Sequence, residues 1–143
     1  MEILIDASPD EVWPHLIDTR SWMQEFDLQL ESGQPGSEGG VFGLYGGQEF
    51  LFQIVKLVPG RMMLGANLPS TLQGEDSVGI SMITLSEADG QTLVSNFMSR
   101  LYDWDGGGSN PMRERRSSEE FEQLNAASWD RMLSRLKRIV EQP

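Results

Sequence analysis

Few side chains in this 143-residue sequence are of types that carry out acid–base or metal chemistry. His15 is the only histidine and cysteine is absent, so a thiol nucleophile, a zinc–thiolate cluster and a multi-histidine metal site are excluded. His15 follows Pro14 in an apolar segment without a serine nucleophile nearby, which favours a structural role over catalysis. We therefore assign no catalytic residue and expect no metal ion and no cofactor.

Two other segments contain parts of ligand-binding motifs. Residues 103–106 read Asp-Trp-Asp-Gly, but the third acidic position and the closing glutamate of a calcium loop are missing, so we interpret this segment as a hinge. The glycines between residues 36 and 47 are not followed by Gly-Lys-Ser or Gly-Lys-Thr and do not join a strand to a helix, as a phosphate-binding loop would. Neither segment predicts a calcium or nucleotide site.

Polar side chains that could contact a ligand alternate along the last predicted strand, residues 91–104. Because successive side chains of a strand point to opposite faces, one face carries Val94, Asn96, Met98, Arg100 and Tyr102. Arg100 could hold a carboxylate or phenolate by paired hydrogen bonds. An internal salt bridge, or a position near the solvent end of the strand, accounts for it equally well. Alternation alone does not show which face of the sheet is concave.

The charge of the chain makes nucleic acid an unfavourable partner. The sequence has 11 Lys+Arg and 22 Asp+Glu, a net charge of -11, which repels phosphate backbones and anionic lipid headgroups. Basic residues gather at Arg113, Arg115 and Arg116, which we interpret as a match to the acidic remainder rather than an anion site.

No segment approaches the ~20 apolar residues of a membrane span, and residues 1–6 contain no basic leader, so we expect a cytoplasmic protein.

Hydrophobic spacing and turn residues predict one α+β domain over residues 1–143. A strand at 2–6 precedes a helix that begins at Pro9, where Ser8 and Glu11 form a capping box. Asp18 is expected to cap a second short helix over 19–24. Six antiparallel strands follow, separated by glycine- and proline-containing turns, at 27–32, 41–45, 49–58, 61–68, 77–86 and 91–104. Glycines in and around the second and third of these strands indicate a strongly curved sheet.

Residues 118–141 carry apolar side chains every three or four positions and predict a terminal helix. Ser117 and Glu120 form a second capping box at its start. At 1.5 Å per residue, this helix would extend about 36 Å and cross a whole sheet.

This order of elements resembles the START-like superfamily, also called SRPBCC. The residues that carry the resemblance are IDASPDEVW at 5–13, the glycine-rich segment 36–40, Pro-Gly-Arg-Met at 59–62 and Gly-Gln-Thr at 90–92. The resemblance covers the full chain and implies a helix-grip fold, in which a curved antiparallel sheet of about seven strands wraps around a long C-terminal helix. The W-F-x-P element of the chaperone-activator branch is absent, because Trp22 is followed by Met23, Gln24 and Glu25.

The resemblance also implies a cavity between sheet and helix, lined by apolar and aromatic groups with a few polar anchors. In this family the residue two positions after the turn threonine points inward, which here selects Val94 and with it Asn96 and Arg100. The eight methionines suit either an adaptable pocket or an ordinary core. The predicted cavity lining is Trp22, Phe26, Met63, Asn67, Ser81, Ile83, Val94, Asn96, Met98, Arg100, Tyr102, Leu124 and Met132.

Three functions remain open on this basis. The first is binding or transport of a small hydrophobic molecule, lipid-like or polyketide-like and aromatic, which requires only an apolar cavity. The second is a polyketide cyclase or dehydratase in which Asn96, Arg100, Tyr102 or His15 moves protons, and which requires converging titratable groups. The third is a protein-interaction module, which requires an exposed apolar patch. Because few titratable residues are expected inside, the sequence favours a binding protein over an enzyme, and it leaves the oligomeric state open.

Overall fold

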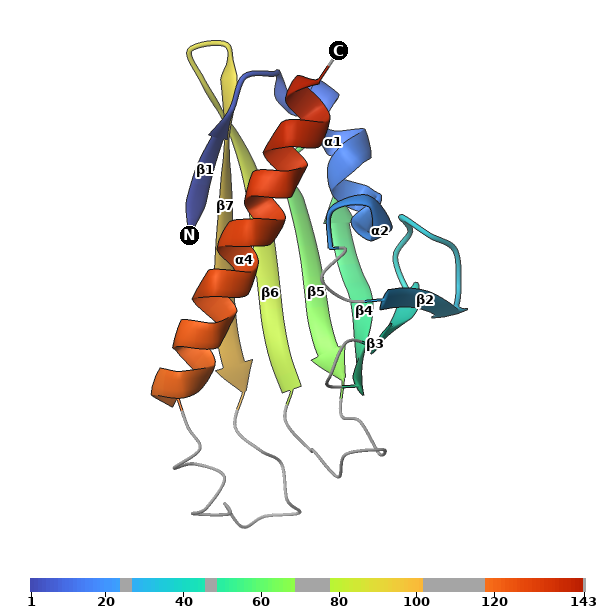
Figure 1. Cartoon of the computed structure of the whole chain (residues 1–143). Coiled ribbons are helices and arrows are strands. Elements are labelled where there is room, and N and C mark those ends of the chain that lie inside the picture. The colour runs from blue at the N-terminus through green and yellow to red at the C-terminus, as the bar shows by residue number, and fades with distance from the viewer. Residues whose placement is uncertain (24–26, 46–48, 69–77, 102–117, 143) are drawn as a thin grey trace.

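A curved antiparallel sheet and a long C-terminal helix are the main layers of the computed structural model (Figure 1). The structure describes the backbone of residues 1–23, 27–45, 49–68, 78–101 and 118–142. Within these ranges it describes the side chains of 1–23, 33–41, 52–66, 80–97, 126–127 and 129–142. The strands are β1 (Glu2–Ile5), β2 (Asp27–Ser32), β3 (Val41–Tyr45), β4 (Glu49–Val58), β5 (Met62–Leu68), β6 (Val78–Ala88) and β7 (Gln91–Leu101). The helices are α1 (Pro9–Ile17), α2 (Thr19–Trp22) and α4 (Ser118–Glu141).

The described strands form one seven-stranded sheet in the order β1-β7-β6-β5-β4-β3-β2, and every neighbouring pair is antiparallel. The predicted fold class is confirmed, the described strand ends lie within two residues of the predicted ones, and the described part of β7 reaches Leu101. The predicted continuation of β7 over 102–104 and the predicted cap at Ser117 lie outside the described residues.

The start of α1 is fixed by the predicted capping box. The backbone N–H of Glu11 donates to Ser8 Oγ at 3.3 Å, and the N–H of Ser8 donates to Glu11 Oε2 at 2.8 Å. The capping role predicted for the Asp18 side chain is wrong, because this side chain makes no cap hydrogen bond at the start of α2. Ser21 Oγ donates to the backbone oxygen of Asp18 at 2.7 Å, and this oxygen also accepts from the N–H of Ser21 at 3.0 Å, so the bond does not replace a cap of the N–H groups.

Strands β6 and β7 form a long hairpin through a two-residue turn. Asp89 and Gly90 both have positive φ, 53° and 80°, and lie between the paired residues Ala88 and Gln91. Two successive positive φ angles are typical of a type I′ turn, whose twist matches that of antiparallel strands. The tight turn fixes the register of this hairpin and therefore fixes which residues of β6 and β7 share a face.

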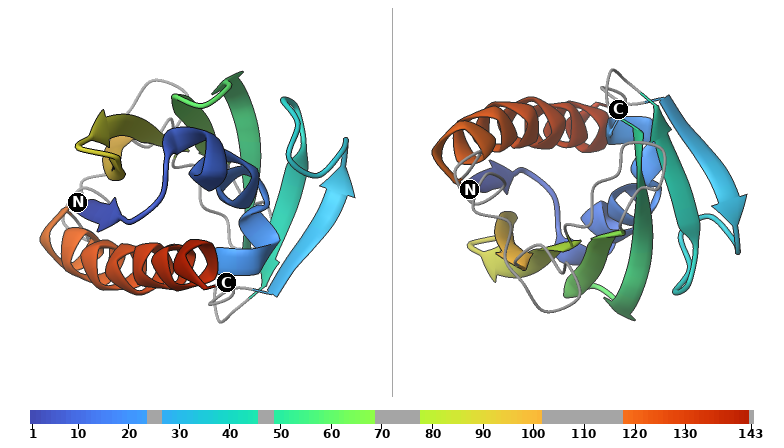
Figure 2. Two further views of the ribbon diagram at one scale, coloured as in Figure 1. Left: turned by 90° about the horizontal axis from the view of Figure 1, so that it is seen from above. Right: turned by 90° about the horizontal axis from the view of Figure 1, so that it is seen from below.

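The curvature of the sheet has two visible sources. The pairing of β4 with β5 shifts register between Ile54 and Lys56, so that Val55 is an extra residue, and an extra residue bends and twists a strand. The pairing of β2 with β3 also shifts register, between Leu30 and Ser32. In the loop that follows, the backbone approaches closely, because a Cβ on Gly33 would lie 2.9 Å from the Cα of Gly40. Seen from above and below, the sheet curves from β1 beside α4 to β3 and β2 on the opposite side, with α1 and α2 inside the curve (Figure 2).

Helix α4 crosses the concave side of the sheet, and α1 and α2 lie at the end where α4 finishes (Figures 1 and 2). Its last turns are attached to the N-terminal strand. Lys137 Nζ donates to the backbone oxygen of Leu4 at 2.7 Å and to Glu141 Oε1 at 2.6 Å, and Glu141 Oε1 also accepts from the N–H of Asp6 at 2.8 Å. The helix is therefore held across the sheet by polar contacts as well as by its buried face.

Candidate functional site

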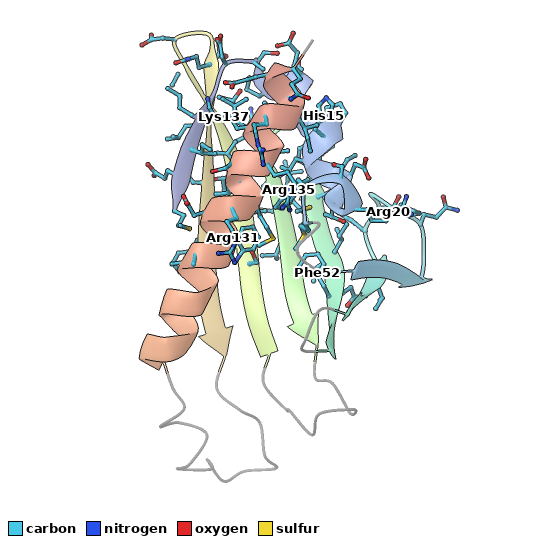
Figure 3. All side chains as sticks on the ribbon, viewed as in Figure 1. His15, Arg20, Phe52, Arg131, Arg135 and Lys137 are labelled. Carbon is cyan, nitrogen blue, oxygen red and sulfur yellow. The ribbon has the colours of Figure 1, made fainter. Side chains whose placement is uncertain are left out.

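One end of the space between sheet and α4 is filled by a packed apolar core. Trp22 of α2 is completely buried, and its ring lies 5.9 Å from that of Trp129 of α4 at an angle of 48°. The indole Nε1 of Trp22 donates to the backbone oxygen of Leu16 at 3.0 Å. Arg135 extends from α4 toward α2, where its Nη1 donates to the Trp22 backbone oxygen at 2.9 Å (Figure 3). The end of the interior that contains Trp22 and Trp129 is therefore a packed core.

Two polar side chains lie on the concave face further along β6 and β7. Ser81 and Asn96 are 7% and 9% exposed, and Ser81 Oγ donates to Asn96 Oδ1 at 3.1 Å. Their neighbours along the same strands, Ile83 and Val94, are buried and apolar. Within the described part of the chain nothing accepts a hydrogen bond from Asn96 Nδ2. The pair therefore presents a free amide donor in an apolar interior.

The predicted inward face of β7 agrees with the burial of its described residues. Val94 is fully buried and Asn96 nearly so, whereas the intervening neighbour Phe97 is 62% exposed. Ser81 and Ile83 of β6 and Met63 of β5 are buried on the same side, and Ile83 pairs with both Met63 and Asn96.

The structure gathers most of the described predicted residues into one cluster. Trp22, Met63, Ile83, Val94 and Met132 all belong to the same buried core. Packing of this kind fills space, so these residues form the wall and closed end of the interior. Whether they contact a ligand stays a prediction.

The side chains of the other predicted lining residues are not among those that the structure describes. Phe26 and Tyr102 lie outside the described residues, and for Asn67, Met98, Arg100 and Leu124 only the backbone is described. The register pairs Met98 with Ser81 and Arg100 with Gly79, which puts both positions on the concave face beyond the polar pair. The backbone thus continues the candidate site away from Trp22.

Sequence reasoning missed Phe52, which is buried in the core from β4. Its ring lies over Gly65 of β5, where an added Cβ would be 2.3 Å from Phe52 Cζ. A glycine inside a strand often marks a close approach, and this was the available signal at residue 65. Trp129, Leu133 and Leu136 of α4 are also buried, although only Met132 and Leu124 of this helix were predicted to line the interior.

Comparison with known proteins identifies the fold. No protein-family model and no curated protein matches the sequence, but solved structures match along the whole chain. Protein CV1439 from Chromobacterium violaceum has a TM-score of 0.68 at 17% identity, covering 100% of this chain and 96% of that one. Truncated norcoclaurine synthase from Thalictrum flavum has a TM-score of 0.70 at 11% identity, covering 100% and 92%. CalU16 from Micromonospora echinospora has a TM-score of 0.64 at 19% identity, covering 98% and 73%.

This is the START-like helix-grip fold. At identities of 11–19% the likeness establishes the fold alone, and fold alone does not assign an activity. The helix-grip architecture locates the space between α4 and the concave face, and the chemistry of that space has to come from this chain's own residues.

No titratable side chain is among the buried residues of the described part of this helix-grip chain. Its buried polar residues are Thr19, Ser81, Thr92 and Asn96. Thr92 Oγ1 donates to the backbone oxygen of Ala7 at 2.7 Å, and Thr19 Oγ1 is the one enclosed side-chain atom in the described part without a partner. His15 is half-buried in the last turn of α1 and makes no hydrogen bond to a described residue. The described interior offers hydrogen bonds without proton transfer.

Charged groups act at the surface. The ammonium of Lys137, followed by the N–H of Asp6, lowers the pKa of Glu141. The backbone N–H of Leu57 lowers the pKa of Glu38, and the nearby ammonium of Lys56 at 3.6 Å contributes. Both carboxylates therefore strengthen contacts between elements of the fold and lie apart from the interior.

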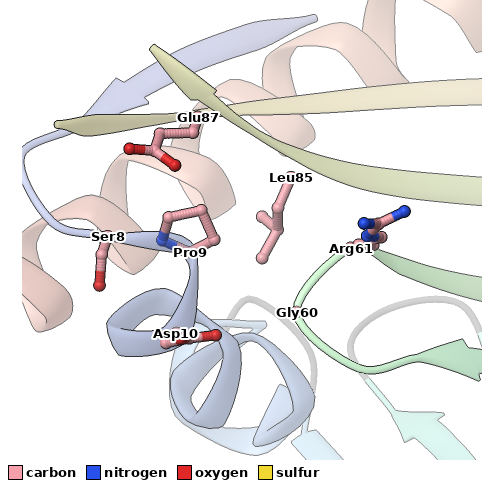
Figure 4. A pocket seen from close by; sticks show the side chains of 7 residues that line it. All are labelled: Ser8, Pro9, Asp10, Gly60, Arg61, Leu85 and Glu87. Atoms are coloured by element: carbon pink, nitrogen blue, oxygen red, sulfur yellow. The ribbon is translucent and has the colours of Figure 1, made fainter. Parts of the chain in front are cut away.

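A separate open groove of about 400 Å³ lies where α1 begins (Figure 4). It is lined by Ser8, Pro9, Asp10, Gly60, Arg61, Leu85 and Glu87. Its charged side chains are exposed and Ser8 is engaged in the capping box, so the groove contains no buried polar group that lacks a partner. We assign no site to it.

Within the described residues no cluster of three or more histidine, aspartate or glutamate side chains could hold a metal ion. In the same part of the chain, no helix combines the length and apolar character needed to cross a membrane.

Proposed function

We propose that this chain binds a small hydrophobic molecule between the concave face of the sheet and α4, and that Asn96 is its polar anchor. The observation that carries the proposal is the buried Ser81–Asn96 pair with its free amide donor. Asn96 Nδ2 is not among the fully enclosed unpartnered atoms of the described part, so water or a ligand can reach it. A ligand that brings an oxygen acceptor to Asn96 Nδ2 would take the place of that water.

The Ser81–Asn96 pair also determines whether the ligand must accept or donate a hydrogen bond. Because Ser81 Oγ donates to Asn96 Oδ1, the carbonyl end of the amide is occupied and the Nδ2 end is left for a ligand. Asn96 carries no charge. The ligand would therefore be an apolar molecule with a neutral acceptor, such as a ketone, ester or ring carbonyl.

The surroundings of the pair are suited to the apolar part of such a ligand. Met63, Ile83 and Val94 share the concave face with the pair, and Met132 belongs to the same buried cluster. Thioether side chains adapt to irregular shapes. Since the Trp22–Trp129 end is packed solid, the ligand would lie on the other side of the pair, toward positions 98 and 100.

Binding is proposed in preference to catalysis because the described interior contains hydroxyl and amide groups but no buried titratable group. A cyclase or dehydratase needs a group that takes up or releases a proton near neutral pH. Serine and asparagine can orient a carbonyl oxygen, but they do not supply that step unaided.

A matched ligand pair tests the anchor. We expect 2-acetylnaphthalene to bind about 5- to 10-fold more tightly than 2-ethylnaphthalene by isothermal titration calorimetry, because the two differ mainly in the oxygen acceptor. In Asn96→Leu the preference should disappear while the hydrocarbon still binds. Ser95→Leu, one residue away on the outer face, should keep the preference. Equal affinity of both ligands for the original protein would refute the anchor.

A space-filling variant tests the cavity itself. Ser81→Phe places a ring beside Asn96, while Met82→Phe adds a ring at the adjacent outward position. If there is room for a ligand, Ser81→Phe should fold with nearly unchanged stability and lose at least 10-fold in binding of a fluorescent apolar probe. Met82→Phe should keep both. If the interior is solid, Ser81→Phe will lose about 1–3 kcal/mol of stability and the original protein will not bind the probe.

A further inference from the structure

We propose that the outer, convex face of the sheet is a contact surface between two copies of this chain. The face is formed by β1, β7, β6 and β5, on the side opposite α4. We call its apolar residues the outer patch: Leu4, Leu64, Ile80, Met82, Leu93 and Phe97.

The register puts the outer patch on one face of the sheet, in two groups on either side of a polar level. Phe97 of β7 pairs with Met82 of β6, which pairs with Leu64 of β5, so the three lie in a row across three strands. Leu4 of β1 pairs with Leu93, two outward levels from Phe97, and the level between them holds Glu2, Ser95 and Thr84. Phe97 is 62% exposed and Leu4 is 41% exposed. An antiparallel sheet with one solvent-exposed face usually carries polar residues on that face. A row of large apolar side chains on it therefore indicates a surface that is covered by a partner.

The central part of this face is also free of charge. The described outward positions of β5, β6 and β7 hold apolar residues, serine, threonine and glutamine but no Asp, Glu, Lys or Arg. Charged residues make up 23% of the whole chain. For two molecules that each carry a net charge of -11, a neutral surface is where close approach costs least.

Charges at the two margins of the face favour a second copy as the partner. Glu2 lies on β1 and Lys56 on β4, and both are exposed, each with one weak partner in its own chain: Glu2 Oε1 accepts from Ser95 Oγ at 3.4 Å, and Lys56 Nζ lies 3.6 Å from Glu38. In the strand order, β1 and β4 are each two strands away from β6. A twofold axis parallel to β6 would therefore bring β1 of one copy over β4 of the other. Because the axis makes each contact occur twice, Glu2 of each copy would face the strand that carries Lys56 of the other. In this arrangement the neutral apolar centre meets itself, and each Glu2 lies nearer to a Lys56 than to the other Glu2.

The size of the contact predicts a weak dimer. Four strands about 4.8 Å apart and six residues long give a footprint of roughly 400 Å² per copy. The pair would bury on the order of 1,000 Å², which is at the low end of specific interfaces. We therefore expect a dissociation constant on the order of 10–100 µM, with tighter association at higher salt because the long-range repulsion is screened.

Analytical ultracentrifugation of the full chain between about 5 and 500 µM tests the proposal. The original protein should pass from monomer to dimer in this range, and Phe97→Glu should weaken association at least 10-fold. Gln142→Glu adds the same charge at an exposed position outside the sheet and should leave association unchanged. Phe97→Thr keeps a strand-forming residue and no added charge, so its loss of association would separate the effect from misfolding.

Charge reversal tests the twofold arrangement. Glu2→Lys and Lys56→Glu should each weaken the dimer, and the double variant, which restores the net charge of -11, should recover most of the loss. A chain that stays monomeric at all concentrations, or a dimer that tolerates Phe97→Glu, would overturn the proposal. Phe97-dependent binding of a monomer to phosphatidylcholine vesicles would overturn it in favour of a lipid surface.

Discussion

The two faces of the strands β5, β6 and β7 are both rich in apolar side chains, but they differ in what covers them. The inner face lies under α4 and buries Met63, Ile83 and Val94. The outer face carries Leu64, Met82 and Phe97 at the neighbouring positions and leaves them half-buried or exposed. Burial here is decided by which face the helix covers and not by the hydrophobicity of the residues.

The polar residues of the two faces differ as well. On the inner face Ser81 and Asn96 bond to each other and leave one amide donor without an acceptor in the described part. On the outer face Ser95 Oγ donates to Glu2 Oε1 at 3.4 Å at the exposed edge with β1, where water can satisfy its remaining bonds. The inner amide donor of Asn96 is therefore available to a ligand, whereas the outer hydroxyl of Ser95 is satisfied without one. Substitutions at adjacent inward and outward residues can test this difference between the faces.

The largest difference between the faces should appear when the same charge is introduced on each. Ile83→Asp places a carboxylate at a position that is 1% exposed, and we expect a loss of more than about 4 kcal/mol or failure to fold. Met82→Asp, at the adjacent outward position, should lose less than about 1 kcal/mol. Urea unfolding followed by circular dichroism measures both. Comparable losses in the two variants would show that the outer face is as enclosed as the inner one.

Removal of an aromatic ring should give the next largest contrast. Trp22→Ala removes a fully buried ring, its contact with Trp129 and its hydrogen bond to Leu16, and should cost about 3–5 kcal/mol. Phe97→Ala should cost less than about 1 kcal/mol in dilute solution, where the chain is monomeric. Thermal unfolding at low and high protein concentration separates the folding effect from the dimer effect. A concentration-independent, large loss in Phe97→Ala would contradict the exposure of this ring.

A smaller effect is expected at Gly65, which gives room to the Phe52 ring on the inner face. Gly65→Ala puts a methyl group 2.3 Å from Phe52 Cζ, so the ring must move, at a cost of about 1–3 kcal/mol. Phe52→Leu shortens the side chain and should reduce the cost of the alanine substitution. A double-mutant cycle measures this coupling, and additive effects would show that the two residues do not meet.

The sequence predicted the elements well because their determinants are local. Ser8 and Glu11 are three residues apart and fix the start of α1 wherever the helix lies. The turn at Asp89 and Gly90 similarly fixes the β6–β7 register. The Asp18 side chain failed as a cap because α2 begins immediately after α1, with a backbone conformation at residue 18 that does not aim the carboxylate at the helix start.

The site was less accessible to prediction because it depends on contacts between distant segments. With apolar residues on both sides of β7, alternation could not identify the concave face, and only the family resemblance selected Val94 and Asn96. The Ser81–Asn96 bond joins two strands diagonally across the register, and the place of Phe52 over Gly65 depends on how β4 meets β5. The outer patch likewise becomes visible only when the strand order is known.

The smallest predicted effect concerns the contacts that hold α4 over the inner face. The Lys137 ammonium and the Asp6 N–H lower the pKa of Glu141 in the folded chain, so this carboxylate stabilises the fold when it is ionised. Its contribution is present above the ordinary glutamate pKa of about 4.3 and is lost as the pH falls through the lower pKa of the folded state. The free energy of unfolding of Glu141→Gln should therefore lie below that of the original protein at pH 7, and the two should converge as the pH falls below about 4. Glu87→Gln controls for the loss of one negative charge. A difference that persists at low pH would assign the effect of Glu141 to packing, and the attachment of α4 to β1 would then rest on the bond from Lys137 to Leu4.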